Sequence, residues 1–413
     1  MPTTLMTPVP VAKPSLITRP LLVRFLSVAG SSVSFYLPLS VVPRYAASSG
    51  SDAGAGLATG ALLLATVAAE LATPRLVARV GYRLSLTAGL ALLGAPALAL
   101  LASSRLTVIL AVSIVRGLGF AVTTVAGGAL TASLIPAERR GEGLGLVGIV
   151  SGVPSLVCLP LGLWISVHWG YGPVFAATAI AALAALGSMP WLPGRSPSPG
   201  HEPAVGPASP VGPASPVGPA SPVGPARPGC GVLAGLRIPA LVRPAVIFSA
   251  ATMATGVLVT FLPLAVRSTG VAAVALLAQP AAATLARWAA GRIGDRHGQA
   301  RLLGPGVLLS AAGMALLVAT GRPALVVAGA ACFGTGFGLL QNATLSLMYA
   351  RVSVDGYDSV SAIWNAAYDA GMGGGAAGIG LLVAHTGYPA AFGLTAALIL
   401  PALLLTRRER TTR

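Results

Sequence analysis

Two ionisable residues stand in the middle of long apolar runs. Arg116 lies about ten residues into the run 106–130, and Asp369 has a similar place in the run 360–383. At about 1.5 Å per residue, both would lie near the centre of a bilayer if these runs are membrane-spanning helices. Charges at that depth mark substrate pathways and proton relays. We predict that Asp369 takes up and releases a proton, and that Arg116 positions an anionic substrate group or competes with it for the carboxylate.

A structural role is the alternative for both residues, as an ion pair or as a tie between helix and backbone that fixes packing. Two further ionisable residues, Glu70 and Arg287, stand near the ends of their runs. Long side chains at such positions can reach water along the helix surface. We therefore expect Glu70 and Arg287 to lie outside the functional site.

Uncharged polar residues accompany the two central charges. Gln341 and Asn342 lie deep in the run 323–348, and Tyr368 precedes Asp369. Asn365 and Asp369 are four residues apart, which places them on one face of a helix. We predict that these residues bind substrate or help to move protons. The alternative is hydrogen bonding between helices, worth about 0.6 kcal/mol per contact.

The elements that position these residues must lie in lipid. Of the 413 residues, 55% are hydrophobic and only 9% are charged, against roughly 25% charged in soluble domains. The net charge of +16 comes from short arginine clusters between apolar runs, so we exclude nucleic-acid binding. The three cysteines have no metal or redox spacing, which predicts no metal and no cofactor. The sequence has no phosphate-binding Gly-Lys-Ser/Thr loop, which argues against an ATP-driven pump.

Twelve apolar runs are long enough to cross a bilayer, which takes about 20 residues. The predicted spans are 22–42, 54–73, 84–103, 106–130, 143–166, 172–192, 243–265, 270–290, 300–319, 323–348, 360–383 and 389–406. The sequence therefore predicts an all-α membrane protein with two six-helix bundles, in residues 1–193 and 238–413. Between them, residues 194–237 repeat Val-Gly-Pro-Ala-Ser-Pro, a composition typical of an extended or disordered linker.

The distribution of basic residues predicts the orientation. With the N-terminus inside, 21 of the 26 Lys and Arg residues fall on the cytoplasmic side. The opposite side holds Arg44, Arg105, Arg267 and Arg322, and Arg116 lies within a span. Cytoplasmic loops are enriched in Lys and Arg, so both termini are expected in the cytoplasm. Arginine-rich usage with a single Lys suggests a bacterial inner membrane.

The second half of the chain repeats the first. Gly170-Tyr171 reappears 217 residues later as Gly387-Tyr388, and Gly117, Gly119 and Phe120 reappear at the same offset as Gly334, Gly336 and Phe337. Near the start of each half, Leu37-Pro38-Leu39 matches Leu262-Pro263-Leu264 at an offset of 225. The first outer loop must therefore be eight residues longer than its counterpart. Six spans per half make the repeats parallel.

This pattern resembles the major facilitator superfamily of transporters, from about Arg19 to Arg408 outside the linker. That family's loop between the second and third helices of each half reads Gly-x-x-x-Asp-Arg-x-Gly. The second half shows it as Gly291, Asp295, Arg296 and Gly298, whereas the first half retains only Arg79 and Gly81. The resemblance implies that these loops take part in conformational change. It also places Arg116, Gln341 and Asn342 on helices that line a central cavity.

Arg116-Gly117-Leu118-Gly119 is similar to a helix signature of drug and metabolite exporters. We therefore expect a monomeric secondary transporter that exports a small organic compound, weakly anionic or amphipathic, in exchange for protons by alternating access. Proton-coupled uptake of a small metabolite is the nearest alternative. A membrane enzyme would need clustered carboxylates, His or Cys near one membrane face, and a receptor would not need the duplication.

Overall fold

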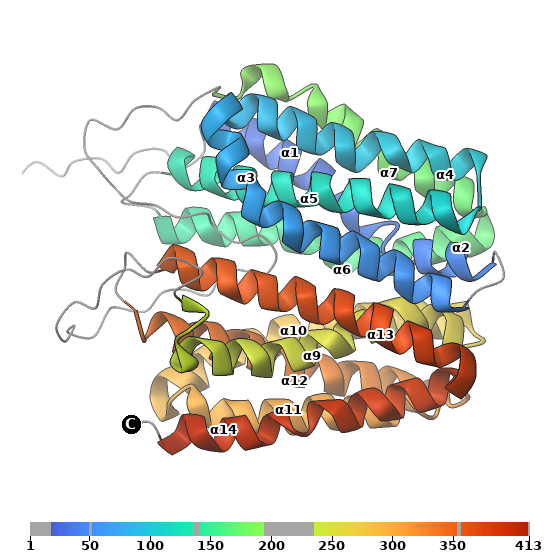
Figure 1. Ribbon diagram of the computed structural model, residues 1–413, viewed down its shortest axis with the longest axis vertical. Coiled ribbons are helices and arrows are strands. Elements are labelled where there is room, and N and C mark those ends of the chain that lie inside the picture. The colour runs from blue at the N-terminus through green and yellow to red at the C-terminus, as the bar shows by residue number, and fades with distance from the viewer. Residues whose placement is uncertain (1–17, 49–51, 136–139, 194–234, 353–356, 412–413) are drawn as a thin grey trace, which may run out of the picture.

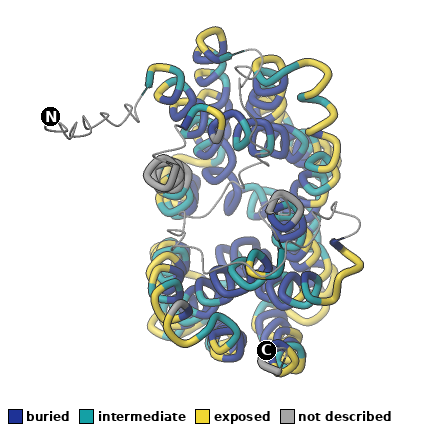
Figure 2. Tube along the Cα trace, turned by 90° about the vertical axis from the view of Figure 1, so that its left-hand side faces the viewer, coloured by how far each residue is buried: buried dark blue, intermediate teal, exposed yellow. Residues whose placement is uncertain are grey.

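The computed structural model describes residues 18–48, 52–135, 140–193, 235–352 and 357–411. Within these ranges the regular structure is entirely helical, and twelve membrane-spanning helices form two bundles of six, one above the other in Figure 1. Large apolar side chains are exposed on the outward faces, for example Ile180, Leu285 and Leu404 at 65%, 69% and 65%. Figure 2 shows buried residues gathered inside each bundle and exposed ones around it. Such a surface suits lipid and not water.

The N-terminal half carries the first six spans. Its elements are α1 (Arg19–Tyr36), α2 (Val42–Ser48), α3 (Asp52–Gly94), η1 (Ala95–Leu98), α4 (Ala99–Ala102), α5 (Leu106–Leu134), α6 (Arg140–His168), α7 (Tyr171–Leu186) and η3 (Met189–Trp191). The second and third spans both lie in α3, where the backbone at Gly81 interrupts the helix with φ 81° and ψ 172°. The predicted helices are therefore present, with α1 ending before Pro38.

The C-terminal half repeats this order. Its elements are α9 (Pro239–Ala265), α10 (Thr269–His297), α11 (Ala300–Leu316), α12 (Pro323–Tyr349), α13 (Tyr357–Ile399) and α14 (Ala402–Thr411). The last two spans are separated at Gly387, where φ is 75° and ψ is 166°. Seven described segments across the two halves are long and apolar enough to cross a membrane by length and composition.

The duplication is also visible in the backbone conformation of four glycines. Among the described residues, positive φ occurs at Gly81, Gly170, Gly298 and Gly387. They form two pairs, Gly81 with Gly298 and Gly170 with Gly387, each 217 residues apart. Side chains with a Cβ are strongly disfavoured at φ near +80° with an extended ψ, so glycine is required where the chain reverses between spans. The same backbone reversal therefore occurs at matching places in both halves.

The eight extra residues of the first half form a helix of their own. In the second half, α9 runs through Pro263 to Ala265 and α10 begins at Thr269. In the first half the chain leaves α1 at Leu37 and forms α2 before α3 begins. Tyr45 of α2 donates a hydrogen bond to the carbonyl oxygen of Leu100 at 3.0 Å, and its ring packs against Phe175. The insertion is thus an ordered cover on one end of the N-terminal half.

The end of the molecule opposite α2 is called the basic end here, because most of the arginines lie there. Arg83, Arg296 and Arg351 are among them. Arg351 at the end of α12 bonds the carbonyl oxygen of Ala240 at the start of α9 and the carboxylate of Glu409 in α14. In the first half, Arg83 donates to the carbonyl oxygen of Leu192 at 2.9 and 2.6 Å. The second half therefore begins and ends at the basic end, as an even number of spans requires. The predicted linker lies mostly outside the described residues.

The two halves contact each other mainly through α3 and α13, and through α6 and α10. The α3–α13 contact, called the glycine seam, is made by small residues: Gly56, Gly60, Gly373, Ala376, Ala377 and Gly380. A Cβ on Gly380 would come within 2.9 Å of the Gly56 Cα atom. Nearby, Thr260 of α9 donates to the hydroxyl of Thr59 at 3.0 Å. The seam lies toward the end opposite the basic end and holds the halves together there.

Candidate functional site

A cavity between the two halves begins where the glycine seam ends. It contains about 490 Å³ of space not filled by protein atoms, including space that is open to solvent. Two of its lining residues adjoin the seam: Leu63 of α3, which lies against the seam residue Gly373, and Met372 of α13. The remaining lining residues are Phe35, Tyr36, Leu39, Glu70, Phe120, Trp364, Asn365, Tyr368 and Asp369. The cavity therefore lies on the basic-end side of the seam, with walls from α1, α3, α5 and α13.

Aromatic rings make up much of both walls. From the N-terminal half, Phe35 stacks on Phe120 with centroids 3.6 Å apart and meets Tyr36 edge to face. From the C-terminal half, Trp364 and Tyr368 belong to α13. Trp364 stacks on Phe248 at 4.3 Å, and its indole N–H donates to Thr344 at 3.1 Å. These contacts fix the rings, so the cavity has preformed apolar walls on both sides.

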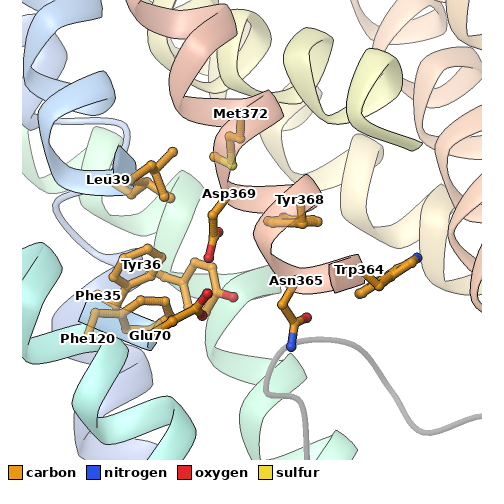
Figure 3. A pocket seen from close by; sticks show the side chains of 11 residues that line it. Phe35, Tyr36, Leu39, Glu70, Phe120, Trp364, Asn365, Tyr368, Asp369 and Met372 are labelled. Carbon is orange, nitrogen blue, oxygen red and sulfur yellow. The ribbon is translucent and has the colours of Figure 1, made fainter. Parts of the chain in front are cut away.

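Each half places one carboxyl group on the cavity wall. Glu70 comes from α3 and Asp369 from α13, and Figure 3 shows the Asp369 carboxyl pointing from α13 toward the ring of Tyr36. Within the described part of the chain, neither carboxyl has a salt bridge or hydrogen-bond partner. The two groups repel each other when both are ionised. No Lys, Arg or His is among the described residues that line this cavity.

Three of the predicted site residues share this cavity. Asn365, Tyr368 and Asp369 all line it, as their helical spacing allows. Arg116 lines a second cavity within the N-terminal half, which shares Phe35 and Leu39 with the first. Its Nη2 atom donates to the carbonyl oxygen of Ser34 at 2.6 Å. Arg116 and Asp369 therefore do not form a pair. Instead, the hydrogen bond of Arg116 joins α5 to α1.

Gln341 and Asn342 are buried in α12 but do not line either cavity. The amide of Asn342 donates to Gln299 at 3.2 Å, just before α11. This contact lies at the basic end of the C-terminal half. A polar residue deep in an apolar run can face either a neighbouring helix or the centre of the molecule. Only the packing of α11 and α12 decides between these two directions.

Arg287 does not reach water as we expected. It is buried on α10, and its Nε and Nη1 atoms have no partner among the described residues. Glu70 is half-buried and lines the cavity seven residues after Leu63, on the same face of α3, instead of lying outside the site. The signal for Glu70 was its helical spacing from Leu63, together with its being an acid in an apolar run.

Arg24, one of the 21 basic residues expected on the cytoplasmic side, is a further buried charge. Its guanidinium donates to the carbonyl oxygen of Gly127 at 3.2 Å and to the hydroxyl of Thr131 at 3.1 Å, and it also bonds Ser27. These contacts join α1 to α5 at the basic end. Arg24 and Arg116 thus hold the same two helices together at two levels.

The predicted loop motifs lie at the basic end, away from the cavity. Gly291, Asp295 and Arg296 belong to the last turns of α10, and Gly298 follows with φ 88°. Arg79 and Gly81 occupy the equivalent bend in α3, and both arginines are exposed. The side chain of Asp295 lies outside the described part of the structure. The two bends share their backbone reversal even though the first lacks the acidic residue.

Comparisons with known proteins agree with this architecture. The sequence model described as Major Facilitator Superfamily matches residues 24–376 and, a second time, residues 245–413. A crystal structure of a point mutant of the nucleoside transporter NupG matches with a TM-score of 0.67 and 12% identity, over 94% of this chain and 99% of that one. The xylose transporter XylE from E. coli, in a partially occluded inward open conformation, matches with a TM-score of 0.68 and 13% identity, over 95% and 98%. No curated protein matches the chain.

A bundle of twelve helices in two repeated halves, with a cavity between them, is the arrangement of a secondary transporter. The chain belongs to the Major Facilitator Superfamily. It is therefore a multi-pass membrane protein that transports small molecules, and it is not an enzyme. The second family match begins at residue 245, near the start of the second bundle, which agrees with the duplication.

Proposed function

We propose that this protein exports a small organic compound across a bacterial inner membrane in exchange for protons. The observation that carries the proposal is the pair of carboxyls, Glu70 and Asp369, on one cavity between the halves. Two like charges in a site with few polar groups are costly, so protons or a bound cation must neutralise them. A site that holds either protons or substrate exchanges one for the other when it changes sides.

Asp369 is the proposed proton carrier, with Glu70 as its partner across the cavity. Asn365 and Tyr368 are proposed substrate contacts on the same wall. Arg116 is proposed to support the site by holding α1, which bears Phe35 and Tyr36. Gln341 and Asn342 are proposed to contribute to transport indirectly, through their effect on the packing of α12.

The proposed orientation places the basic end and both termini in the cytoplasm, with residues 194–237 linking the halves there. The glycine seam then closes the outer side, so the described conformation faces inward. In this orientation the cytoplasmic side holds both loop bends, Arg79–Gly81 and Gly291–Gly298. Their proposed role is to guide the rocking of the two halves. We propose that one chain suffices for transport, because the cavity is complete within it.

The test uses the full-length protein in everted membrane vesicles that are acidified by respiration. Compounds from three classes, organic cations, organic anions and neutral nucleosides or sugars, are added while a fluorescent dye reports the internal pH. Transported compounds should release protons from vesicles with the wild-type protein. Asp369→Asn should abolish this release, whereas Glu202→Gln, which changes an acid of the predicted linker, should retain it. Full proton release in Asp369→Asn would overturn the proposal.

Uptake together with protons is the second candidate, because the two solved structures that match are named as transporters of a nucleoside and of xylose. Proteoliposomes separate the two directions. A radiolabelled compound that accumulates when the interior is acidic exchanges with protons, and one that accumulates when the interior is alkaline moves with them. The second result would replace export by uptake.

A further inference from the structure

We propose that the transported compound is a lipophilic organic cation, whose charge lies between Glu70 and Asp369 and whose apolar part lies between the aromatic walls. This inference rests on the proposed function, because it assigns a substrate class to the same cavity. It replaces the weakly anionic compound that the sequence suggested.

The charges of the lining argue for a cation. The described lining has two carboxyls, one from each half, and no basic side chain. Arg116 is the arginine that could have attracted an anion, but it lines the neighbouring cavity and donates to the Ser34 backbone. An anion would therefore meet two like charges without a compensating group. A cation between the carboxyls would neutralise both halves of the site at once.

The aromatic residues argue for an apolar body on that cation. Five of the eleven lining residues are aromatic: Phe35, Tyr36, Phe120, Trp364 and Tyr368. The negative faces of such rings attract cations, most strongly where water is excluded. The Trp364 N–H is already bonded to Thr344, so this indole offers mainly its ring to a ligand. A sugar or nucleoside would need several polar partners, and the uncharged ones that this lining offers beside the carboxyls are Asn365 and the hydroxyls of Tyr36 and Tyr368.

The cavity is also placed where binding can be coupled to movement of the halves. The walls come from both halves, so binding of a ligand that touches both would depend on how the halves are placed relative to each other. The cation and the protons would then occupy the same two carboxyls alternately, which is the exchange that the proposed function requires.

The groups that can titrate around the site are few. Glu70, Asp369, Tyr36 and Tyr368 line the cavity, the Cys158 thiol lies beside Tyr36, and Arg116 lines the neighbouring cavity. The carboxyls are the groups that ionise most readily. Cation binding should therefore release protons from Glu70, Asp369 or both. By linkage, affinity for the cation should rise with pH, by up to about tenfold per pH unit for each proton released.

The experiment measures binding of radiolabelled tetraphenylphosphonium to the purified full-length protein in detergent. The neutral comparison compound is triphenylphosphine oxide. We expect the cation to bind at least about tenfold more tightly than the neutral compound, with at least one proton released per cation, measured with a pH indicator in weakly buffered solution. Glu70→Gln and Asp369→Asn should each weaken cation binding about tenfold or more, and at least one of them should release fewer protons per cation than the wild type.

The aromatic wall is tested separately with two equivalent substitutions. Phe120→Leu removes a ring from the cavity wall, and Phe333→Leu removes a ring of α12 that is buried but does not line the cavity. We expect Phe120→Leu to weaken tetraphenylphosphonium binding by up to about tenfold, in line with the loss of a cation–π contact. Phe333→Leu should leave the affinity of the folded protein unchanged. Thermal unfolding measurements show how much folded protein each sample contains.

Equal binding of the cation and the neutral compound would overturn the inference, as would wild-type cation affinity in both carboxyl variants. The proposed function fails in a different way. Proton-coupled flux of a neutral or anionic compound without tetraphenylphosphonium binding would reject the substrate class and leave exchange with protons intact. Cation binding with proton release, but without proton flux in vesicles for any compound, would support the substrate class and reject coupled transport.

Discussion

At the residue scale, the buried arginines of the N-terminal half and the carboxyls of the cavity have separate tasks. Arg24 and Arg116 both extend from one helix to another and bond backbone oxygens, so their charges are used in packing α1 against α5. Glu70 and Asp369 have no such partners among the described residues and face open space. Unpaired carboxyls on a cavity are available to protons and ligands. The Nη1 atom of Arg116 also has no partner among the described residues, but this side chain lines the neighbouring cavity and not the one that holds the carboxyls.

A substitution at Arg116 tests its structural contribution. Arg116→Met keeps much of the side-chain volume but leaves the Ser34 carbonyl oxygen without its donor. Hydrogen bonds between membrane helices contribute up to about 1.7 kcal/mol, so we expect a loss of about 1 kcal/mol in the free energy of unfolding. Thermal unfolding of the purified protein should show a decrease of a few degrees. Arg105→Met, at the exposed start of the same helix, is the control; an equal decrease there would contradict the prediction.

At the element scale, the glycine seam between α3 and α13 decides which end of the molecule is closed. Its glycines let two backbones approach so closely that a Cβ would collide with the opposite helix. Without a hydrophobic driving force between helices in lipid, such close packing is a main source of helix association. The seam can separate without breaking strong polar bonds; within the described residues its hydroxyl contact is the one between Thr59 and Thr260.

A larger side chain in the seam should shift the protein toward the conformation that is open at that end. Gly380→Val places a Cβ against the Gly56 backbone, whereas a Cβ at Gly378 on the same helix meets nothing within 4 Å. Spin labels on two pairs of exposed positions, Arg105 with Arg322 and Val80 with His297, report the distances between halves at the two ends. Gly380→Val should lengthen the first distance and shorten the second.

Gly378→Val should leave both distance distributions as in the wild type, because its new side chain has space. Unchanged distances in folded Gly380→Val, or the same shift in both variants, would contradict the assignment of the seam as the closed end. Thermal unfolding of both variants identifies samples that have lost their fold.

At the scale of the whole molecule, duplication gives two bundles with the same path, and the cavity belongs to neither bundle alone. The paired reversals at Gly81 and Gly298, and at Gly170 and Gly387, show that the backbones retained this path. The side chains have diverged: the first half supplies Glu70, Phe35 and Phe120 to the cavity, and the second supplies Asp369 and Trp364. A symmetric frame with an asymmetric lining suits recognition of a ligand that is itself asymmetric.

The orientation can be tested with topology reporters. Alkaline phosphatase is active only outside the cytoplasm and green fluorescent protein fluoresces only inside. Fused after Leu192 or after Arg413, the fluorescent protein should be bright and the phosphatase inactive, because both positions follow an even number of spans. Fusions at Arg105 should show the opposite pattern. Active phosphatase at Leu192 or Arg413 would contradict either the proposed orientation or the proposed parallel duplication.

Much of the fold follows from the sequence alone. The spans, the halves and the longer first outer loop could be predicted, because lipid forces every backbone group into helices and the apolar runs show where they are. The shared offset of 217 predicted parallel halves without any coordinates. For the site, the spacing of Asn365, Tyr368 and Asp369 was enough to place them on one helix, and the depth of Asp369 pointed to the cavity.

Only the tertiary structure decided which polar residues face one another. It moved Glu70 from a presumed helix end to the cavity, buried Arg287 and Arg24, and separated Arg116 from Asp369. The physical reason is that a sequence records how deep a residue lies along its helix, whereas the direction of a side chain around the helix gains meaning only from the neighbours. Those neighbours are set by the packing of helices hundreds of residues apart, and in this protein by the seam that joins α3 to α13.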